Sequence, residues 1–390
     1  METRAALLRE VPGKWEIHTV ELDPPRDHEV LVRIVAAGLC HSDDHFCTGD
    51  ITVGHLPFCG GHEAAGVVEA VGPGVRGLKE GDHIVTSFVP GCGRCRWCAS
   101  GMQALCDNGA LMLEGHQLDG TYRMHFEGED VAQAGLVSTF AEYSVMPEWS
   151  CIKIAEDIPL DVAALLGCAV PTGWGSAVNA AQVRPGDVVI IVGIGGIGIS
   201  AVQGAKHAGA SRIIAVDPVE MKRNAALELG ATDAFADHEE SAELARSLTN
   251  GQGADSAIIC VGVLSGDNVA AAFSAIRKAG TVVVTAAAPD TEVRMPVGLL
   301  ELTMFQKRIQ GSIYGMMSPS KDVPRLLELW QSGQLKLEEL ITRSYGLDEL
   351  NQGYADMHAG VNLRGLLSFD EPRTPTSAAA AAERAGALSR

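Results

Sequence analysis

Four cysteines lie close together in the first third of the chain, at a spacing that suits a metal ion. They are separated by two, two and seven residues, and they are Cys92, Cys95, Cys98 and Cys106. Four thiolates can close a tetrahedral shell around Zn²⁺ and leave no position for a substrate, so such a site is structural. Disulfides are the alternative, but they need an oxidising compartment, and the amino terminus has no signal-peptide pattern. We therefore expect a cytoplasmic protein in which these cysteines bind structural zinc.

Three further residues could form a second, open metal site. Cys40 begins the run Cys-His-Ser-Asp-Asp-His, His62 lies in Gly-His-Glu, and Cys168 follows much later in the chain. A catalytic zinc takes three protein ligands and leaves one position for water or substrate, and two cysteines with one histidine form one such set. Taken singly, each residue is better interpreted as a buried thiol or a core histidine. The zinc interpretation depends on their occurring together with a nucleotide-binding motif.

That motif is a glycine-rich turn that follows a predicted strand and begins a predicted helix. It has the form Gly-x-Gly-x-x-Gly, and its residues are Gly193, Gly195, Gly196, Ile197 and Gly198. Such a turn lets backbone N–H groups at a helix N-terminus bind a pyrophosphate. Asp217 ends the next predicted strand, where a carboxylate accepts a hydrogen bond from the adenosine ribose and repels a 2′-phosphate. The motif therefore predicts NAD rather than NADP, with Lys222 as a further ribose contact.

The elements that must position these residues follow two patterns. The chain has 390 residues, which favours two domains. Residues 1–169 begin with short β-rich runs broken by Gly and Pro, which predicts a mainly β domain, although residues 107–137 look like a long loop. Strands and helices then alternate, which predicts a doubly wound parallel sheet over residues 170–312. Residues 313–370 are expected to return to the first domain, and the alanine-rich residues 371–390 to be a disordered tail.

Composition excludes several classes of function. The formal net charge is −19, and a surface this acidic repels nucleic acid and anionic membranes. Aromatic residues make up 5% of the chain, too few for a platform on which bases stack. No apolar run is long enough to cross a bilayer. We therefore expect a small-molecule substrate, with no nucleic-acid or membrane partner.

Taken together, the motifs resemble those of the zinc-dependent medium-chain alcohol dehydrogenase family over residues 5 to 370. The resemblance rests on the three motifs described above, Gly-Cys-Ala-Val-Pro-Thr-Gly at 167–173 and Asn-Leu-Arg at 362–364. It implies a GroES-like catalytic domain, a Rossmann domain, two zinc ions per chain and NAD-dependent oxidation of alcohols. It also implies that the catalytic zinc is held by Cys40, His62 and Cys168. Glu63 then corresponds to a nearby carboxylate that can approach the metal, and Asp43 to the partner that orients His62.

The resemblance also implies how a proton leaves and where the cofactor lies. The family's proton path runs through Ser42, the cofactor ribose and His45. Thr172 is implied beside the nicotinamide ring, and Arg364 and position 41 near the pyrophosphate. Many relatives have arginine at position 41. Because His41 is a weaker and titratable cation, cofactor affinity is expected to fall as pH rises through neutrality.

The substrate pocket is implied by the same resemblance. Ile51, Phe88 and Ile313 match positions that line an apolar pocket in the family. Ala134 and Ala287 stand where relatives often have bulkier groups. We therefore expect room for a larger or branched alcohol.

Other functions stay open on the sequence. A nicotinoprotein would keep NAD(H) bound and pass electrons to an external acceptor. A thiol-adduct formaldehyde dehydrogenase would need cations for the carboxylates of the thiol carrier, and residues 107–122 contain acids but no Lys or Arg. Zinc-free relatives that act as structural proteins lack the catalytic ligand set. We further expect a homodimer or homotetramer, as the family resemblance implies.

Overall fold

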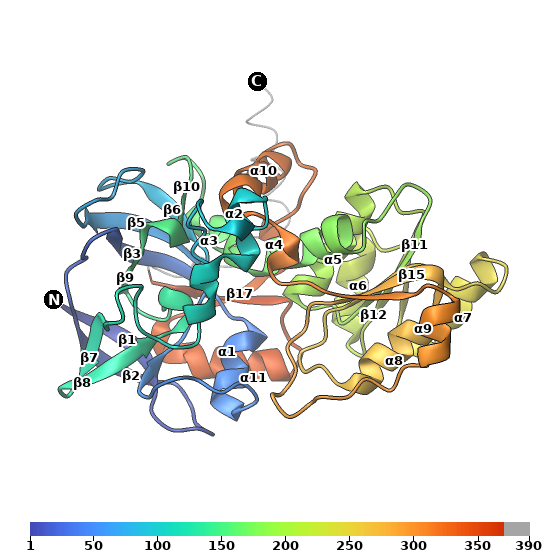
Figure 1. Ribbon diagram of the computed structural model, residues 1–390, viewed down its shortest axis with the longest axis horizontal. Helices are drawn as coiled ribbons and strands as arrows, with labels where there is room; N and C mark the ends of the chain where they lie inside the picture. The colour runs from blue at the N-terminus through green and yellow to red at the C-terminus, as the bar shows by residue number, and fades with distance from the viewer. Residues whose placement is uncertain (370–390) are drawn as a thin grey trace.

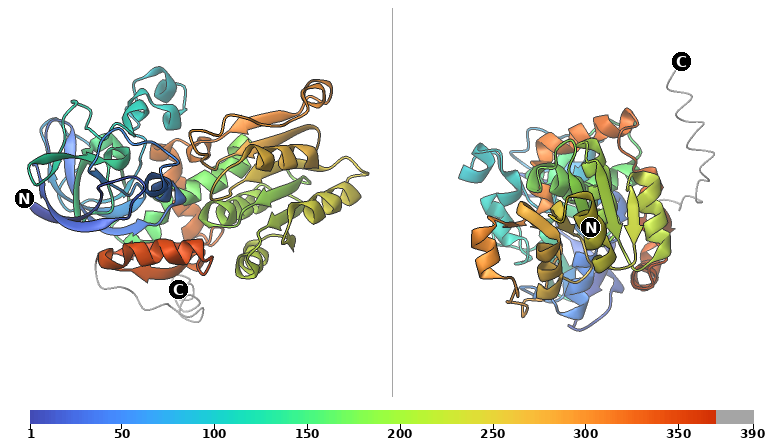
Figure 2. Two further views of the ribbon diagram at one scale, coloured as in Figure 1. Left: turned by 90° about the horizontal axis from the view of Figure 1, so that it is seen from below. Right: turned by 90° about the vertical axis from the view of Figure 1, so that its right-hand side faces the viewer.

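The computed structural model describes residues 1–369, and the disordered tail predicted at 371–390 lies outside these residues. Figure 1 shows two halves side by side. One half is rich in β-structure and contains the N-terminal and the last described segments. The other half is built around a parallel sheet, and the end-on view of Figure 2 shows helices on both sides of that sheet.

The β-rich half contains a barrel and a second sheet. The closed barrel has the strand order β1-β2-β7-β8-β4, and the neighbouring sheet has the order β10-β6-β5-β3-β18-β17, with β9 paired to β3. The barrel strands are β1 (Glu2–Leu8), β2 (Glu16–Leu22), β4 (Phe58–Cys59), β7 (Met124–Phe126) and β8 (Glu129–Gln133). The strands of the second sheet are β3 (Glu29–Gly38), β5 (Ala64–Val71), β6 (His83–Thr86), β9 (Tyr143–Pro147), β10 (Cys151–Lys153), β17 (Ile341–Tyr345) and β18 (Arg364–Ser368).

The prediction of a long loop at residues 107–137 is wrong. This segment contains β7 and β8, which pair with each other and join β2 to β4 in the barrel. Strands of three and five residues are too short to show a clear alternation of apolar and polar side chains. Their conformation is decided by pairing with distant strands rather than by local pattern.

The second half is a doubly wound parallel sheet, as the sequence predicted. Its strand order is β13-β12-β11-β14-β15-β16, in which the direction of winding reverses beside β11. Its central strands carry buried apolar side chains toward both faces, because helices cover both. The strands are β11 (Val188–Val192), β12 (Arg212–Val216), β13 (Asp233–Phe235), β14 (Ala254–Ile259), β15 (Ile276–Val284) and β16 (Arg308–Gly311).

Helices connect the strands of the parallel sheet and also link the two halves. Those of the parallel sheet are α5 (Gly196–His207), α6 (Glu220–Leu229), α7 (His238–Leu248), α8 (Gly266–Ala275) and α9 (Leu299–Met304). The remaining helices are α1 (His41–Thr48), α2 (Arg96–Ala99), α3 (Leu160–Ala164), α4 (Ala169–Gly175), α10 (Pro319–Gln331) and α11 (Leu350–His358). None of the helices in residues 1–369 is long and apolar enough to cross a membrane.

The two halves share a continuous core. Helix α4 packs closely on α5, since a Cβ added at Gly173 would lie 1.9 Å from the Ile197 carbonyl oxygen. One cluster of buried residues includes Leu166 and Leu366 of the β-rich half together with Val189 of the parallel sheet. The chain returns to the β-rich half through β18, which pairs antiparallel with β3. The domain boundaries placed after residues 169 and 312 stay predictions, because the core runs across them.

Candidate active site

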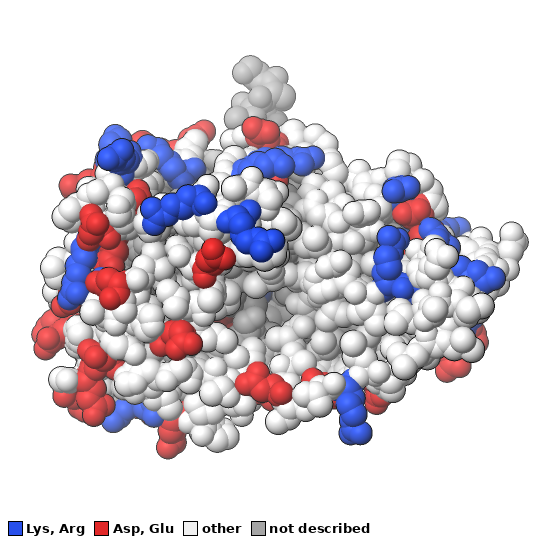
Figure 3. Space-filling view, viewed as in Figure 1, with Lys and Arg blue, Asp and Glu red and all other residues white. Residues whose placement is uncertain are grey.

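A cleft lies between the two halves, and Figure 3 shows the molecular surface hollowed there. Residues from both halves line it. The β-rich half contributes Cys40, His41, Ser42, His45 and Arg364, and the parallel sheet contributes Gly193, Gly195, Gly196, Ile197, Asp217 and Lys222. Open α/β sheets bind ligands at the carboxyl ends of their strands, where the winding reverses. The cleft is therefore the candidate active site.

The three residues predicted as catalytic zinc ligands lie together and are buried. One ligand atom from each of Cys40, His62 and Cys168 lies within 4.8 Å of the others. His62 Nδ1 lies 3.2 Å from Asp43 Oδ1, and this contact leaves the opposite ring nitrogen for a metal. A hydrogen bond from the Cys168 thiol lowers the pKa of Cys40 well below its ordinary value. Two sulfurs, one of them a stabilised thiolate, and one imidazole are donors that suit zinc.

Local backbone structure explains why these three residues converge. Cys40 and Cys168 both occupy the position before a helix, α1 and α4 respectively. Unpaired N–H groups and the helix dipole at such a position favour the thiolate of Cys40, whereas the hydrogen bond to Cys40 and burial raise the pKa of Cys168. Gly61 has φ +84°, and a Cβ there would lie 2.6 Å from the Phe140 nitrogen, so the turn before His62 requires glycine. The Gly61 N–H donates to Asp43 Oδ1 at 2.8 Å, which fixes the carboxylate that orients His62.

Glu63 and Arg364 form a buried ion pair next to this group. Arg364 Nη2 donates to Glu63 Oε2, and the Ala169 N–H donates to the same oxygen at 3.0 Å. Burial raises the pKa of Glu63, against the opposing charge of Arg364. Glu63 lies outside the three-residue ligand group, so its predicted approach to the metal stays a prediction. Arg364 also lines the cleft, and it thereby connects the metal site to the nucleotide site.

The glycine motif forms a cradle at the start of α5. Gly193 has φ +87°, which a side chain would strain, and no atom lies within 4 Å of the position of a Cβ at Gly195. A Cβ at Gly198 would lie 1.8 Å from the Gly193 carbonyl oxygen, so the helix approaches the turn as closely as glycine permits. Open space above the second glycine, at a helix N-terminus, fits a pyrophosphate.

Asp217 lies at the end of β12, at the edge of the same cradle. Its carboxylate accepts hydrogen bonds from the Ile194 N–H at 2.8 Å and the Val219 N–H at 2.9 Å. These bonds hold the side chain in one orientation and leave further lone pairs for a ligand hydroxyl. Lys222 lines the cleft close by. This arrangement fits a ribose at the position that the sequence predicted.

Ser42 and His45, the two predicted catalytic residues, follow Cys40 on α1. The Cys40 Sγ and Ser42 Oγ atoms are 3.6 Å apart. The His45 side chain is only 2% exposed, with Nδ1 lying 2.9 Å from Asp50 Oδ2 and Nε2 lying 3.0 Å from the Gly262 carbonyl oxygen. Both nitrogens of a buried imidazole are therefore in contact with acceptors. Sequence reasoning did not identify Asp50.

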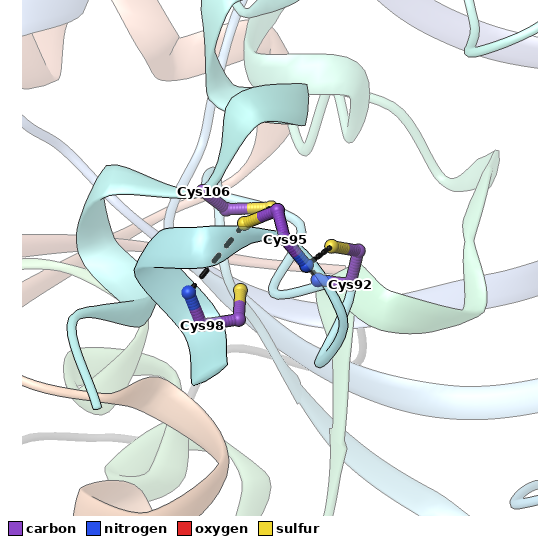
Figure 4. A group of neighbouring side chains, drawn as sticks. All are labelled: Cys92, Cys95, Cys98 and Cys106. Carbon is purple, nitrogen blue, oxygen red and sulfur yellow. Dashed lines mark hydrogen bonds between the residues drawn. The ribbon is translucent and has the colours of Figure 1, made fainter. Parts of the chain in front are cut away.

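The four cysteines of the predicted structural zinc site also come together, at α2 and the turns beside it (Figure 4). The Sγ atoms of Cys95 and Cys106 are 4.0 Å apart. The backbone N–H groups of Cys95 and Cys98 each donate to the sulfur of the preceding cysteine at 3.4 Å. The N–H groups of Cys98 and Asp107 lower the pKa of Cys95 to about 6. Backbone donors that stabilise thiolates fit a closed Cys₄ shell.

The predicted substrate residues occupy different environments. The Phe88 ring packs edge-on against His62, with ring centroids 5.3 Å apart, so it lies beside the metal group. Ile51 packs against the core of the β-rich half, and Ile313 is 37% exposed. Thr172 is buried with Oγ1 4.0 Å from Cys168 Sγ. The roles of these residues in binding stay predictions.

Sequence reasoning missed several residues that line the cleft. Val261 and Gly262 follow β14, Thr285 follows β15, and Met357 lies on α11. Those after β14 and β15 could have been found, because their strands were predicted and ligands bind at such strand ends. Met357 could not, since its place depends on the return of the chain. Asn362 also lines the cleft and belongs to the motif Asn-Leu-Arg at 362–364, although sequence reasoning gave a role only to Arg364.

A doubly wound sheet with a glycine cradle, facing a buried group of two cysteines and one histidine, is the architecture of a two-domain dehydrogenase. Residues 26–156 match the model of the alcohol dehydrogenase GroES-like domain, and residues 196–332 match that of the zinc-binding dehydrogenase domain. The chain is 48% identical to the NDMA-dependent alcohol dehydrogenase of Amycolatopsis methanolica, over 94% of this chain and 99% of that one. It is 43% identical to alcohol dehydrogenase B of Mycobacterium tuberculosis, over 95% and 99% respectively.

Solved structures agree with these matches. An alcohol dehydrogenase zinc-binding domain protein from Burkholderia ambifaria superposes with a TM-score of 0.87 and 34% identity, over 94% of this chain and 99% of that one. Benzyl alcohol dehydrogenase from Acinetobacter calcoaceticus superposes with a TM-score of 0.86 and 30% identity, also over 94% of this chain and 99% of that one. The chain therefore belongs to the zinc-dependent medium-chain alcohol dehydrogenase family, and it is an oxidoreductase that acts on CH–OH groups.

Proposed function

We propose that the protein oxidises alcohols to aldehydes or ketones, and reverses the reaction, with zinc at Cys40, His62 and Cys168 and NAD in the cleft. The observation that carries the proposal is the position of three buried zinc donors beside a cleft that also contains a glycine cradle. A second zinc ion would be held by the four cysteines around α2 and would be structural.

Some residues of the cleft serve the alcohol at the metal site, and others bind the nucleotide. When bound, the zinc ion polarises the alcohol oxygen and the nicotinamide accepts a hydride. Ser42, whose oxygen lies 3.6 Å from a ligand sulfur, is placed to receive the hydroxyl proton. Asp217 binds the adenosine ribose and disfavours NADP. Arg364 supplies positive charge for the pyrophosphate, His41 lines the same cleft with a pKa that burial lowers, and Thr172 borders the nicotinamide.

His45 and Asp50 complete the route by which the proton reaches solvent. His45 is buried and cannot release a proton to water directly, whereas the Asp50 side chain is 27% exposed. When the contact between Nε2 and the Gly262 carbonyl oxygen opens, His45 takes up a proton at Nε2, and Asp50 receives one from Nδ1 and passes it to water. Hydrogen bonds from His45 and Thr48 lower the pKa of Asp50, so its carboxylate is ionised and holds the His45 ring in one orientation.

A second candidate function keeps the same chemistry but not the same electron acceptor. The relative from Amycolatopsis methanolica is named for dependence on NDMA. Its 48% identity favours a nicotinoprotein, in which NAD(H) stays in the cleft and an external acceptor reoxidises it. The two candidates differ only in whether the nucleotide exchanges between turnovers.

We also propose that the chain forms a homodimer through the edge of the parallel sheet, with a homotetramer as the larger alternative. Strand β16 ends the sheet, and the adjacent helix α9 exposes large apolar side chains. Leu299, Leu300 and Met304 are 73%, 77% and 68% exposed. An unpaired strand edge beside exposed apolar residues is suited to pairing with a second copy.

The test compares the wild type with Cys168→Ser. Each protein is assayed for product from primary and secondary alcohols, with NAD and with an artificial acceptor without added NAD, and its zinc content is measured. We expect two zinc ions and NAD-linked turnover in the wild type, against one zinc ion and no turnover in a folded variant. Turnover with the acceptor alone, with NADH found in protein stripped of free nucleotide, would support the second candidate. Wild-type turnover in Cys168→Ser would overturn the zinc site.

A further inference from the structure

Beside the cleft, three side chains that take no part in the catalytic zinc group converge on one point. His41 and Asp44 are three residues apart on α1, so they lie on the same face of the helix, and His358 is the last residue of α11. His358 Nε2 lies 2.7 Å from Asp44 Oδ2, and His41 Nε2 lies 3.9 Å from the same oxygen. One ligand atom from each of the three lies within 4.8 Å of the others.

We propose that His41, Asp44 and His358 bind a third divalent metal ion of the zinc class. Two imidazoles and a carboxylate are a donor set that zinc and its neighbours accept. Bonds of about 2.0–2.2 Å in a tetrahedral site place ligand atoms about 3.3–3.6 Å apart. The observed separations of 2.7 and 3.9 Å fall on either side of that range, so small side-chain rotations bring the three donors to an ion.

The exposure of the site suits an ion that binds from solution. The side chains of His41 and His358 are 34% and 52% exposed, so an ion can enter and water can complete its coordination. His41 also lines the nucleotide cleft, and an ion here would add positive charge at the rim of that cleft.

An ion pair between His358 and Asp44 would not by itself require His41. His18 offers a comparison, because its half-buried imidazole lies 3.1 Å from Glu16 Oε2. Among residues 1–369, His18 belongs to no group of three potential ligands. The imidazole of His41 is therefore the feature that distinguishes the proposed metal site from a surface ion pair. His18 provides a matched control.

The test counts zinc in the wild type, His358→Ala and His18→Ala, each carrying its resident metal and brought to equilibrium with excess zinc by dialysis. We expect the wild type and His18→Ala to bind one zinc ion per chain more than His358→Ala. No difference between wild type and His358→Ala, or an equal loss in His18→Ala, overturns the proposal. His358→Gln keeps the size of the side chain and a hydrogen bond to Asp44. It should fold like the wild type and still lack the third ion, and a third ion bound to it also overturns the proposal.

Discussion

At the scale of single residues, the contact between His45 and Asp50 is the feature that most directly bears on catalysis. Gly49 follows the last residue of helix α1 in a left-handed conformation with φ +83°, and the chain turns back there so that Asp50 contacts His45. A buried imidazole held by a carboxylate has a fixed orientation and a route for its proton.

Asp50→Asn should therefore slow alcohol oxidation. A carboxamide keeps the shape of the side chain but cannot take the proton, and steps of general base catalysis contribute about 10²–10⁴-fold, so we expect a fall in kcat of about tenfold or more. The measurement is kcat with a solvent isotope effect, which should increase. Thr48→Val removes the other hydrogen bond to Asp50 and should change kcat little. Equal kcat values in Asp50→Asn and the wild type would show that the proton leaves by another route.

The sequence predicted the three members of the metal group but not Asp50. Cys40, His62 and Cys168 were found because motifs place each of them in a known family. The Asp50 contact has no such signal, because it depends on a turn made possible by one glycine. His358 was not found for a related reason, since it lies 314 residues from Asp44 in the chain.

At the scale of elements, we expect the segment around α2 to depend on the proposed zinc ion for its structure. Helix α2 has four residues and contributes no buried side chain. Such a helix is too short to be stable on its own. Its fold therefore requires the four thiolates to be held together.

Cys95→Ala should destabilise the protein by opening this shell. Structural zinc contributes several kcal/mol, so its loss should lower Tm by roughly 5 °C or more, with less soluble protein. The matched control is Cys151→Ala, a half-buried cysteine outside all three groups of metal donors. Thermal unfolding of both variants, with zinc content, checks this prediction. An unchanged Tm in Cys95→Ala would exclude a structural role for the site.

A second element-scale feature joins the barrel to the neighbouring sheet. The Arg123 guanidinium, just before β7, is fully buried and donates to Glu29 at the start of β3 and to Asp119. Burial acts to raise the pKa of Asp119, but hydrogen bonds from Thr121 and Arg123 outweigh it and lower the pKa to about 2. A depressed pKa means that the ionised carboxylate stabilises the folded state.

Asp119→Asn should reduce stability in a pH-dependent way. The ionised Asp119 carboxylate makes its full contribution to the free energy of unfolding above the pKa of about 3.9 that Asp has in the unfolded chain. This contribution is lost as pH falls toward about 2. Because the side chain is 44% exposed, we expect only about 1 kcal/mol at neutral pH after allowing for solvent screening. The measurement is urea unfolding of the wild type and the variant at pH 7, 5 and 3.5, values chosen to bracket the unfolded pKa. The difference in free energy of unfolding between the two proteins should be equal at pH 7 and 5 and smaller at pH 3.5. A difference that does not shrink at the lowest pH would mean that the charge of Asp119 is not responsible.

The central strands of the parallel sheet were predictable, whereas its outer strands β13 and β16 and the barrel were not. Strands such as β11 and β12 are continuous apolar runs that end at recognisable turns, so their positions follow from the sequence. Strands β4 and β7 have two and three residues and take their conformation from distant partners. The closed barrel could therefore be inferred from the family resemblance but not from residue pattern.

At the scale of the whole molecule, three hydrogen bonds span the cleft that would hold the nucleotide. His45 Nε2 lies 3.0 Å from the Gly262 carbonyl oxygen. The Asp290 N–H donates to the Asp50 carbonyl oxygen at 2.9 Å, and the Thr52 N–H donates to Asp290 Oδ2 at 3.2 Å. The hydrogen bonds of Asp290 thus connect the exposed segment between β15 and α9 to the β-rich half. We expect the release of a nucleotide to require some of these bonds to open.

Asp290→Ala should accelerate nucleotide release, because it removes one of these bonds and leaves the backbone bond to Asp50. An exposed hydrogen bond contributes about 0.5–1 kcal/mol, so the dissociation rate of NADH should rise about two- to fivefold. If release limits turnover, kcat should rise by a similar factor. Stopped-flow displacement of NADH measures the rate. Glu292→Ala removes a neighbouring acid that accepts a local hydrogen bond from the Arg294 N–H, and this variant should release NADH at the wild-type rate. Equal rates in all three proteins would show that this segment does not retain the nucleotide. An equal rise in both variants would assign the effect to the charge of the segment rather than to its contact with Thr52.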